Sequence, residues 1–351
     1  MLNRINNILS KAVQNNVSDI HFKVENLPFM RLDGDILTIS GEEKWNNKDM
    51  QQLMQEMLNA ENIKKFTTNL VLDFSYNIPN VARFRGNFYQ DTAGIALALR
   101  PIPEHIPSFE DLNMEDVFKS LCYKEHGLIL FTGPTGCGKS TSLATMIDHI
   151  NETQRKHIIT IEQPIEFYHK NKSCLVNQME VGLHSKSFNA SLVAMLREDP
   201  DIILVGELRD LETIRLALTA AETGHVVYAT LHTSSAVKTI NRIIDIFPGA
   251  EKEVVRTILA DSLQTVIAQR LLKKNDQNGG RVAAREIMIC TPAIRSMIRS
   301  NKIPQIYSAI QTGQRYGMIT MEQSLEKLIN DDIISGDVSA LLQYTGDSQI
   351  I

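Results

Sequence analysis

The chain is poor in cysteine and has no long apolar run. Its 351 residues include four cysteines, and no two of them form a C-x-x-C pair. A structural zinc site of the usual ligand spacing is therefore not expected, and reduced thiols are the default without an export signal. No apolar run reaches the roughly 18 residues of a membrane-spanning helix. Because the polar, amphipathic start also lacks the apolar centre of a secretory signal, we expect a cytoplasmic protein that reaches a membrane only through partners.

Excess positive charge is also absent. The formal net charge is −5, which argues against a general nucleic-acid binder, and no basic stripe interleaved with aromatic residues stands out. The hydrophobic content of 43% is sufficient for sizeable cores. By length, about two domains of ordinary size are expected.

The first 100 residues predict a small mixed domain with antiparallel strands. Residues 4–16 have the apolar spacing of an amphipathic helix, and residues 47–69 also read as helical. Asp33-Gly34-Asp35 and Pro79-Asn80 are typical of turns between strands. Strand-like runs are expected at residues 20–24, 29–32, 36–39, 72–76, 81–89 and 95–99.

A proline-rich segment then separates this block from a different pattern. Three prolines within residues 101–107 exclude a helix interior or a central strand, so residues 101–115 are predicted to be a linker and residues 116–351 a second domain. Short apolar strands alternate there with helices, which is typical of a parallel α/β sheet. These strands are expected at residues 128–131, 157–161, 202–205 and 226–230. After Gln269 strand signals thin, with a polar loop at 275–280 and helices at 292–299, 303–312 and 321–330.

Gly133 to Ser140 match G-x-x-x-x-G-K-[ST] in full, between a predicted strand and a predicted helix. Three glycines let the backbone N–H groups point at phosphate oxygens, and the following helix adds the positive end of its dipole. Lys139 is expected to reach the β- and γ-phosphates, and Ser140 to bind Mg²⁺ with help from Thr141. Cys137 is read as a small residue and not as a nucleophile. The predicted nucleotide-binding set is Gly133, Pro134, Thr135, Gly136, Cys137, Gly138, Lys139, Ser140 and Thr141.

Two acidic segments follow predicted strands and should emerge at the same edge of the sheet. Glu207 ends the run Asp201–Glu207 and is a candidate for holding Mg²⁺ or orienting water. The alternative is that it caps the next helix. Glu162 and Glu166 follow the strand at 157–161, where one carboxylate can polarise the attacking water. The alternative is that both are ordinary loop acids.

Two histidines flank the strand at 226–230. His232, beside Thr230 and Thr233, is the better candidate for sensing the γ-phosphate. For His225 a structural role and a functional role remain equally open.

These segments, in order, resemble one family of motors. GPTGCGKST, TIEQPIEF, REDPDIILVGELRDLETI and TAAETGHVVYATLHTSSA are similar to the Walker A, Asp box, Walker B and His box of the secretion ATPases of type II secretion and type IV pili. Extension and secretion ATPases of this family usually carry a four-cysteine zinc module after the His box, and its absence here favours the retraction branch. The segment Ala293–Arg299 is similar to the helix required for retraction in the pilus retraction branch, with Ser296, Met297 and Ser300 as departures.

The resemblance implies a RecA-like P-loop ATPase domain preceded by a smaller α+β, PAS-like domain. It implies Glu166 as catalytic base, Glu207 as Walker B acid and His232 near the γ-phosphate. Ser140, Glu207 and Glu162 would then lie at the metal. The N-terminal domain would offer three arginines to the nucleotide, although pairing with nearby acids on the strand surface is the alternative for them. These are Arg83, Arg85 and Arg100.

The resemblance further implies an ATP- and Mg²⁺-dependent hexameric motor of pilus retraction, peripheral at the inner membrane. Its expected partners are its own copies, a membrane platform protein and a related retraction ATPase, with no nucleic acid and no zinc. Alternatives are a paralogous retraction or type II secretion ATPase, or a regulatory subunit that hydrolyses ATP poorly. Gln163, where the family usually has Asp, is the one feature that favours the regulatory subunit.

Overall fold

The structure, a computed structural model, describes all residues except 16, 33, 80, 103–104, 276–279 and 344–351. The chain divides into two compact units, Met1–His105 and Ile106–Ile351, which are taken separately below. Parts of several predicted features lie outside the described residues: residue 16 of the first helix, Asp33 and Asn80 of the two turns, residues 103–104 of the linker, residues 276–279 of the polar loop and residues 344–351 of the second domain.

The first unit is a six-stranded antiparallel sheet with strand order β3-β2-β1-β6-β5-β4. Helices α1 and α2 bury apolar residues such as Ile5 and Leu53 in one cluster with Phe22 and Phe84 of the sheet. The elements are α1 (Leu2–Gln14), β1 (Asp19–Lys23), β2 (Phe29–Leu32), β3 (Asp35–Thr38), α2 (Asn47–Met57), α3 (Ala60–Asn69), β4 (Val71–Ile78), β5 (Ala82–Gln90) and β6 (Ile95–Ile102).

Two predictions for this unit are wrong in detail. The helix expected over 47–69 is two helices, because Leu58 is extended and the Asn59 side chain accepts the backbone N–H of Asn62 to begin α3. Pro101 is not in a linker but in β6, opposite Phe84. Since β1 pairs with β6 only at residues 96–99, one edge of β6 is open beyond that point and accommodates a proline.

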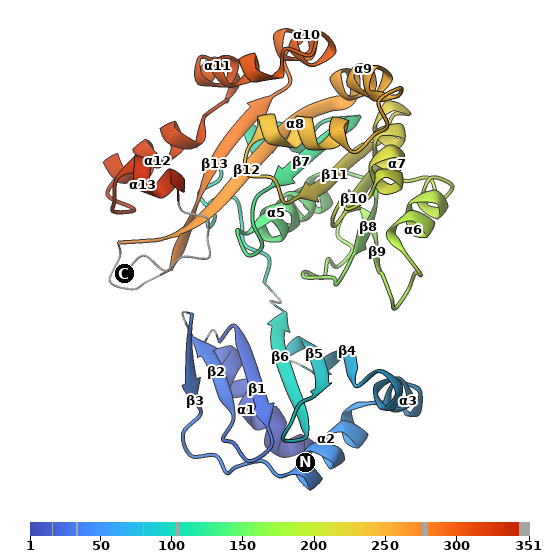
Figure 1. Cartoon of the computed structure of the whole chain (residues 1–351), viewed down its shortest axis with the longest axis vertical. Coiled ribbons are helices and arrows are strands. Elements are labelled where there is room, and N and C mark those ends of the chain that lie inside the picture. The colour runs from blue at the N-terminus through green and yellow to red at the C-terminus, as the bar shows by residue number, and fades with distance from the viewer. Residues whose placement is uncertain (16, 33, 80, 103–104, 276–279, 344–351) are drawn as a thin grey trace. The chain divides into compact units, whose positions relative to one another are not determined.

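The second unit contains a seven-stranded sheet with order β13-β12-β7-β11-β10-β8-β9 (Figure 1). All neighbouring pairs are parallel except β12 and β13. Leu128 and Leu130 pack into one hydrophobic cluster, whereas Ile129 and Phe131 of the same strand pack into another. Helix α5 belongs to the second cluster and α7 to α9 to the first, so both faces are covered, as predicted for a parallel α/β sheet.

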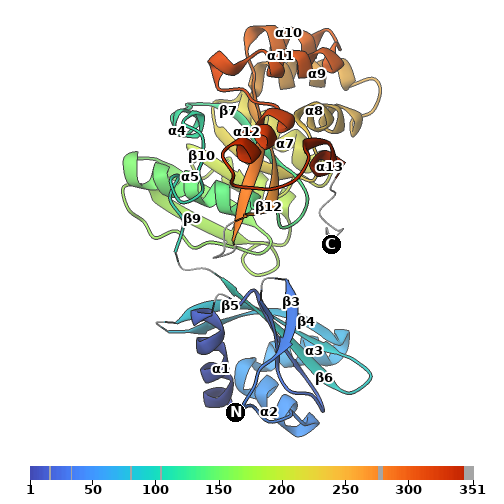
Figure 2. The same ribbon diagram turned by 90° about the vertical axis from the view of Figure 1, so that its left-hand side faces the viewer.

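The bounds of these elements are α4 (Val117–Cys122), β7 (Gly127–Thr132), α5 (Lys139–Thr153), β8 (His157–Glu162), β9 (Leu175–Glu180), α6 (Phe188–Met195), β10 (Ile202–Val205), α7 (Leu211–Glu222), β11 (Val226–Leu231), α8 (Ala236–Asp245), α9 (Lys252–Ser262), β12 (Leu263–Lys273), β13 (Arg281–Ile289), α10 (Pro292–Arg299), α11 (Ile306–Gln311), α12 (Met321–Asn330) and α13 (Val338–Gln343). Short 3₁₀ turns lie at Ile303–Gln305 and Gln314–Tyr316. Figure 2 shows α10 and α11 close together near α9.

The expectation that strands thin out after Gln269 is wrong. Strand β12 runs to Lys273 and pairs along its length with β13 in an antiparallel ladder. Gln269, Arg285 and Glu286 break the apolar pattern of these strands, yet all three are at least 96% buried because each has polar partners in the interior. Strand β9 was also not predicted. Within the described part of the chain, no helix is long and apolar enough to cross a membrane.

Candidate active site

The phosphate-loop motif lies between β7 and α5. Strand β7 ends at Thr132 and α5 begins at Lys139, so the free N–H groups of the helix start face the loop. The Lys139 ammonium is nearly buried and donates to the carbonyl oxygens of Gly133 (2.8 Å) and Pro134 (2.9 Å). Burial raises the pKa of the Cys137 thiol, which makes it a poor nucleophile at neutral pH. The loop therefore has the form of a phosphate-binding loop, and the Lys139 ammonium lies against its backbone.

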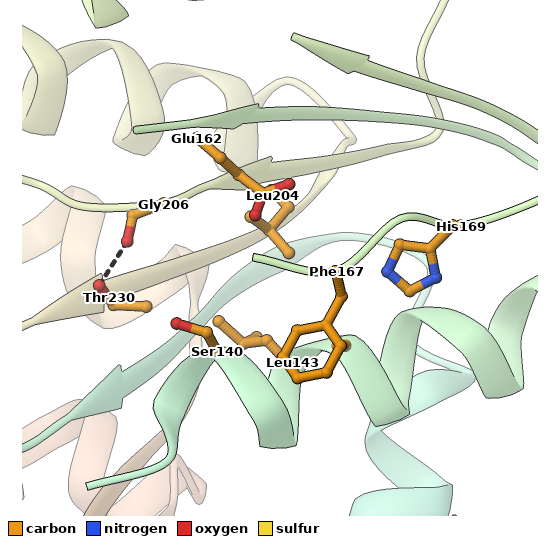
Figure 3. Close-up of a pocket in the computed structure, with 9 residues that line it drawn as sticks. Ser140, Leu143, Glu162, Phe167, His169, Leu204, Gly206 and Thr230 are labelled. Carbon is orange, nitrogen blue, oxygen red and sulfur yellow. Dashed lines mark hydrogen bonds between the residues drawn. The ribbon is translucent and has the colours of Figure 1, made fainter. Parts of the chain in front are cut away.

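Polar groups from four segments meet in a small pocket of about 30 Å³ beside the loop (Figure 3). Ser140 of α5, Glu162 at the end of β8, Gly206 after β10 and Thr230 of β11 line it. Thr230 donates its hydroxyl to the carbonyl of Gly206 at 2.5 Å. The remaining lining residues are Leu143, Ala144, Phe167, His169 and Leu204. The carboxyl ends of these parallel strands thus bring the Walker A serine and the first Asp-box glutamate together.

Glu162 has an unusual proton affinity. Burial raises its pKa to about 7, and the nearby carboxylate of Glu166 adds to the rise. Thr160 Oγ1 at 2.8 Å and Gln178 Nε2 at 3.3 Å donate to the Glu162 carboxylate and oppose the shift. Burial therefore favours the protonated form of Glu162.

The Walker B acid and the His box are in direct contact. His232 Nε2 lies 3.0 Å from Glu207 Oε1, and Arg209 Nε lies 2.7 Å from Glu207 Oε2. Arg209 also donates weakly to Gln163 Oε1 at 3.5 Å. Helix α7 is capped by Asp210, whose side chain accepts the backbone N–H of Thr213. The alternative reading of Glu207 as that cap is therefore wrong.

Two other candidates of the second unit, Glu166 and His225, make different contacts. Glu166 is exposed, and only its backbone N–H bonds to Glu162. His225 binds the carbonyl of Ala220 at 3.0 Å beside the amino end of β11, which is a structural contact. The three arginines belong to the first unit. Arg100 pairs with Asp19 at 2.8 Å and Arg85 lies 3.8 Å from Asp73, which are the contacts of the surface-pairing alternative.

Sequence reasoning missed several polar residues around the site. Arg209 contacts both Glu207 and Gln163, and Gln178 of β9 contacts Glu162. Gln269 of β12 contacts the phosphate loop itself. The available signal for Gln269 was an amide beside Arg270, between the apolar residues Val266–Ala268 and Leu271–Leu272.

The donor set fits a Mg²⁺–nucleotide complex better than a metal held by protein alone. In the described residues, no group of three or more His, Cys, Asp or Glu side chains is placed to hold a metal ion. Mg²⁺ usually keeps several waters and takes one or two protein oxygens together with substrate phosphates. The hydroxyl of Ser140 and the nearby Glu162 carboxylate are hard oxygen ligands of that kind.

A parallel sheet with a phosphate loop at one strand end and acids on neighbouring strands defines a P-loop ATPase. Residues 93–333 match the family described as "Type II/IV secretion system protein". The chain is 50% identical over 331 residues to the "Type IV pilus retractation ATPase PilT" of Pseudomonas aeruginosa, covering 94% of this chain and 95% of that protein.

Two further relatives agree. A "Twitching motility protein" of Neisseria gonorrhoeae is 50% identical over 312 residues, covering 89% of this chain and 83% of that protein. The solved structure "Crystal Structure of the Pilus Retraction Motor PilT and Bound ADP" is 45% identical with a TM-score of 0.88, covering 95% of this chain and 94% of that chain. The chain belongs to the type II/IV secretion system protein family and is a nucleotide-binding ATPase.

Proposed function

We propose that this chain is an ATP-hydrolysing motor subunit that drives type IV pilus retraction. The proposal rests on one observation: a complete phosphate loop lies at the same edge of the sheet as Glu162, Glu207 and His232. The chain is also 50% identical to PilT over nearly its whole length. A pilus motor needs repeated hydrolysis, and this edge supplies a phosphate cradle, acids and a polar sensor.

The roles of the side chains follow from their positions. Lys139 and the loop N–H groups bind the phosphates, while Ser140, Glu207 and Glu162 hold Mg²⁺ and its waters. Mg²⁺ supplies charge neutralisation of the phosphates. Glu166, exposed just beyond Glu162, accepts a proton from the attacking water. His232, in contact with Glu207, links the Walker B strand to the end of β11 and reports the γ-phosphate.

The assembly and partners are a further part of the proposal. Copies of the chain form a ring, a hexamer by the family resemblance, and the N-terminal unit, whose PAS-like character is an expectation, contributes Arg83, Arg85 and Arg100 to a nucleotide. For Arg85 and Arg100 this requires leaving Asp73 and Asp19, with which they pair in the structure. The ring acts at the cytoplasmic face of the inner membrane on a pilus platform protein, together with a related retraction ATPase.

The test is ATP turnover of the purified chain beside Lys139→Ala and Glu166→Gln, with and without Mg²⁺. Glu222→Gln is the matched control, because Glu222 is an exposed acid at the far end of α7. We expect both site variants to lose at least about 100-fold in turnover and the control to match wild type. A wild type that binds ATP but turns over no faster than Glu166→Gln would reject the motor and favour the regulatory subunit.

The direction of action needs a cellular test. In a bacterium that lacks its own retraction ATPase, expression of this chain is expected to restore pilus retraction. Restored protein secretion with no retraction would instead favour the type II secretion alternative.

A further inference from the structure

A buried amide side chain supports the phosphate loop from the neighbouring strand. Strand β12 lies beside β7 (Figure 1), with Ala268 opposite Thr132, so Gln269 lies next to Gly133, the first loop residue. Gln269 is 2% exposed, and its Nε2 donates to the carbonyl oxygen of Cys137 at 2.6 Å. The approach is close, since a Cβ added to Gly138 would lie 2.8 Å from Gln269 Nε2.

This contact fixes the direction of one loop peptide. In a planar trans peptide the C=O of one residue and the N–H of the next point in opposite directions. By holding the Cys137 carbonyl on the β12 side, Gln269 turns the N–H of Gly138 away from β12. Gly138 immediately precedes the start of α5, where free N–H groups bind phosphate.

The orientation of the Gln269 amide is itself fixed. Its Oε1 accepts from Ser142 Oγ at 3.0 Å and from Arg285 Nε at 3.4 Å, so Nε2 must face the loop. Arg285 is 2% exposed and cannot turn freely. Its Nη atoms donate to the carbonyls of Asn113 and Leu112 at 3.1 Å, and Nη1 lies 3.2 Å from Glu115 Oε2.

We propose that Gln269 is a positioning residue for ATP hydrolysis, which holds the 137–138 peptide with its N–H toward the phosphates, and that Arg285 fixes the orientation of the Gln269 amide. The inference rests on the proposed function for its relevance to turnover. It is separable from that function because nucleotide affinity can be measured whether or not ATP is hydrolysed.

The experiment measures binding of fluorescent mant-ADP to the full chain together with the melting temperature of each variant. Gln269→Asn is neutral but too short to reach both Cys137 and Arg285. Gln269→Glu keeps the length and the acceptor for Ser142 and Arg285, but replaces the donor that faces the Cys137 carbonyl. Gln264→Glu is the matched control, because Gln264 Nε2 also donates to a carbonyl, that of His126 at 3.2 Å, from the other end of the same strand.

We expect both Gln269 variants to bind mant-ADP at least about ten-fold more weakly, because the Gly138 N–H would no longer be held toward the phosphates. Gln269→Glu keeps its contacts to Arg285 and Ser142 but leaves the Cys137 carbonyl unpaired, so its melting temperature should fall below that of wild type while the chain stays folded. Arg285→Lys should weaken binding by a smaller factor, because it keeps the charge but not the Nε contact. The Gln264→Glu control should bind as wild type.

Three results would overturn the proposal. The first is a folded Gln269→Asn variant that binds mant-ADP within about two-fold of wild type. The second is weakening by Gln269→Glu alone, which would indicate charge repulsion of the phosphates and not positioning. The third is equal weakening by the Gln264→Glu control. If the wild type binds mant-ADP but does not hydrolyse ATP, the proposed function is rejected, whereas the role of Gln269 in orienting the 137–138 peptide for nucleotide binding still stands.

Discussion

Two glycines of the phosphate loop give a graded test of how tightly the loop is packed. Both have positive φ, +143° at Gly133 and +78° at Gly136. A Cβ at Gly133 would lie 2.3 Å from the backbone oxygen of Gln269 and 2.7 Å from Cys137 Sγ. A Cβ at Gly136 would meet no atom within 4 Å. The same change to alanine should therefore have very different effects on the stability of the chain.

The magnitudes follow from these contacts. At Gly136 the left-handed backbone disfavours alanine by about 1–2 kcal/mol, partly offset by about 0.4–1 kcal/mol from the restricted unfolded chain. At Gly133 the clash is with backbone of β12, which cannot move without shifting the sheet, so we expect at least about 3 kcal/mol. For a unit of this size about 1 kcal/mol corresponds to about 2–4 °C. The net cost at Gly136 is about 0–1.6 kcal/mol, so Gly136→Ala should lower the melting temperature by at most about 6 °C. Gly133→Ala should lower it by at least about 6 °C.

The assay is thermal melting followed by circular dichroism without added nucleotide, so that only the packing of the loop is compared. Equal shifts in the two variants, or a larger shift for Gly136→Ala, would refute the argument that β12 sets the room available to the loop.

Two further predictions concern buried charge and helix ends. The Glu286 carboxyl group accepts the backbone N–H of Ala236 at 2.7 Å, and burial raises its pKa above the ordinary 4.5. The contribution of Glu286 to stability is therefore fully present below about pH 4.5 and is lost as the pH rises through the pKa of the folded state. Glu286→Gln keeps the acceptor, so its melting temperature should gain on wild type as pH rises from about 4.5, and a constant difference across pH would contradict this. Arg295 Nη1 donates to the carbonyls of Ala260 and Asp261 at the end of α9. Arg295→Ala should therefore lower the melting temperature by about 2–4 °C. The control Lys302→Ala, at an exposed position, should leave the melting temperature unchanged.

The parts of the site that lie within one short segment were predictable from the sequence. The phosphate loop has a fixed spacing, and the apolar runs before Gly133 and Glu207 are the strands β7 and β10 as expected. The rule that parallel strands deliver their carboxyl ends to one edge accounts for Glu162 lying at the edge where the phosphate loop follows β7, and Ser140 and Glu162 line one pocket there. Glu207 and His232, from adjacent strands β10 and β11, meet for the same reason.

The basic residues of the retraction-like helix show where local pattern is insufficient. Arg295 and Arg299 are four residues apart in α10 and so share one face of the helix, but that spacing specifies no partner for either. In the structure Arg299 pairs with Asp261 and Arg295 binds the last carbonyls of α9. Both partners precede α10 by more than 30 residues, so neither periodicity nor spacing along α10 indicates them.

Strands β12 and β13, whose pairing was not predicted, also show that local sequence pattern does not reveal distant partners. Gln269, Arg285 and Glu286 disrupt the apolar pattern of β12 and β13, and burying such groups without partners costs several kcal/mol each. Their partners are 132 residues away for Gln269 with Cys137, 173 for Arg285 with Leu112 and 50 for Glu286 with Ala236. A strand can therefore carry these residues only because other segments satisfy them. In a chain whose neighbouring strands are this apolar, a polar residue within a strand is better taken as evidence of a distant partner than as evidence against the strand. For Gln269 that partner is the phosphate loop.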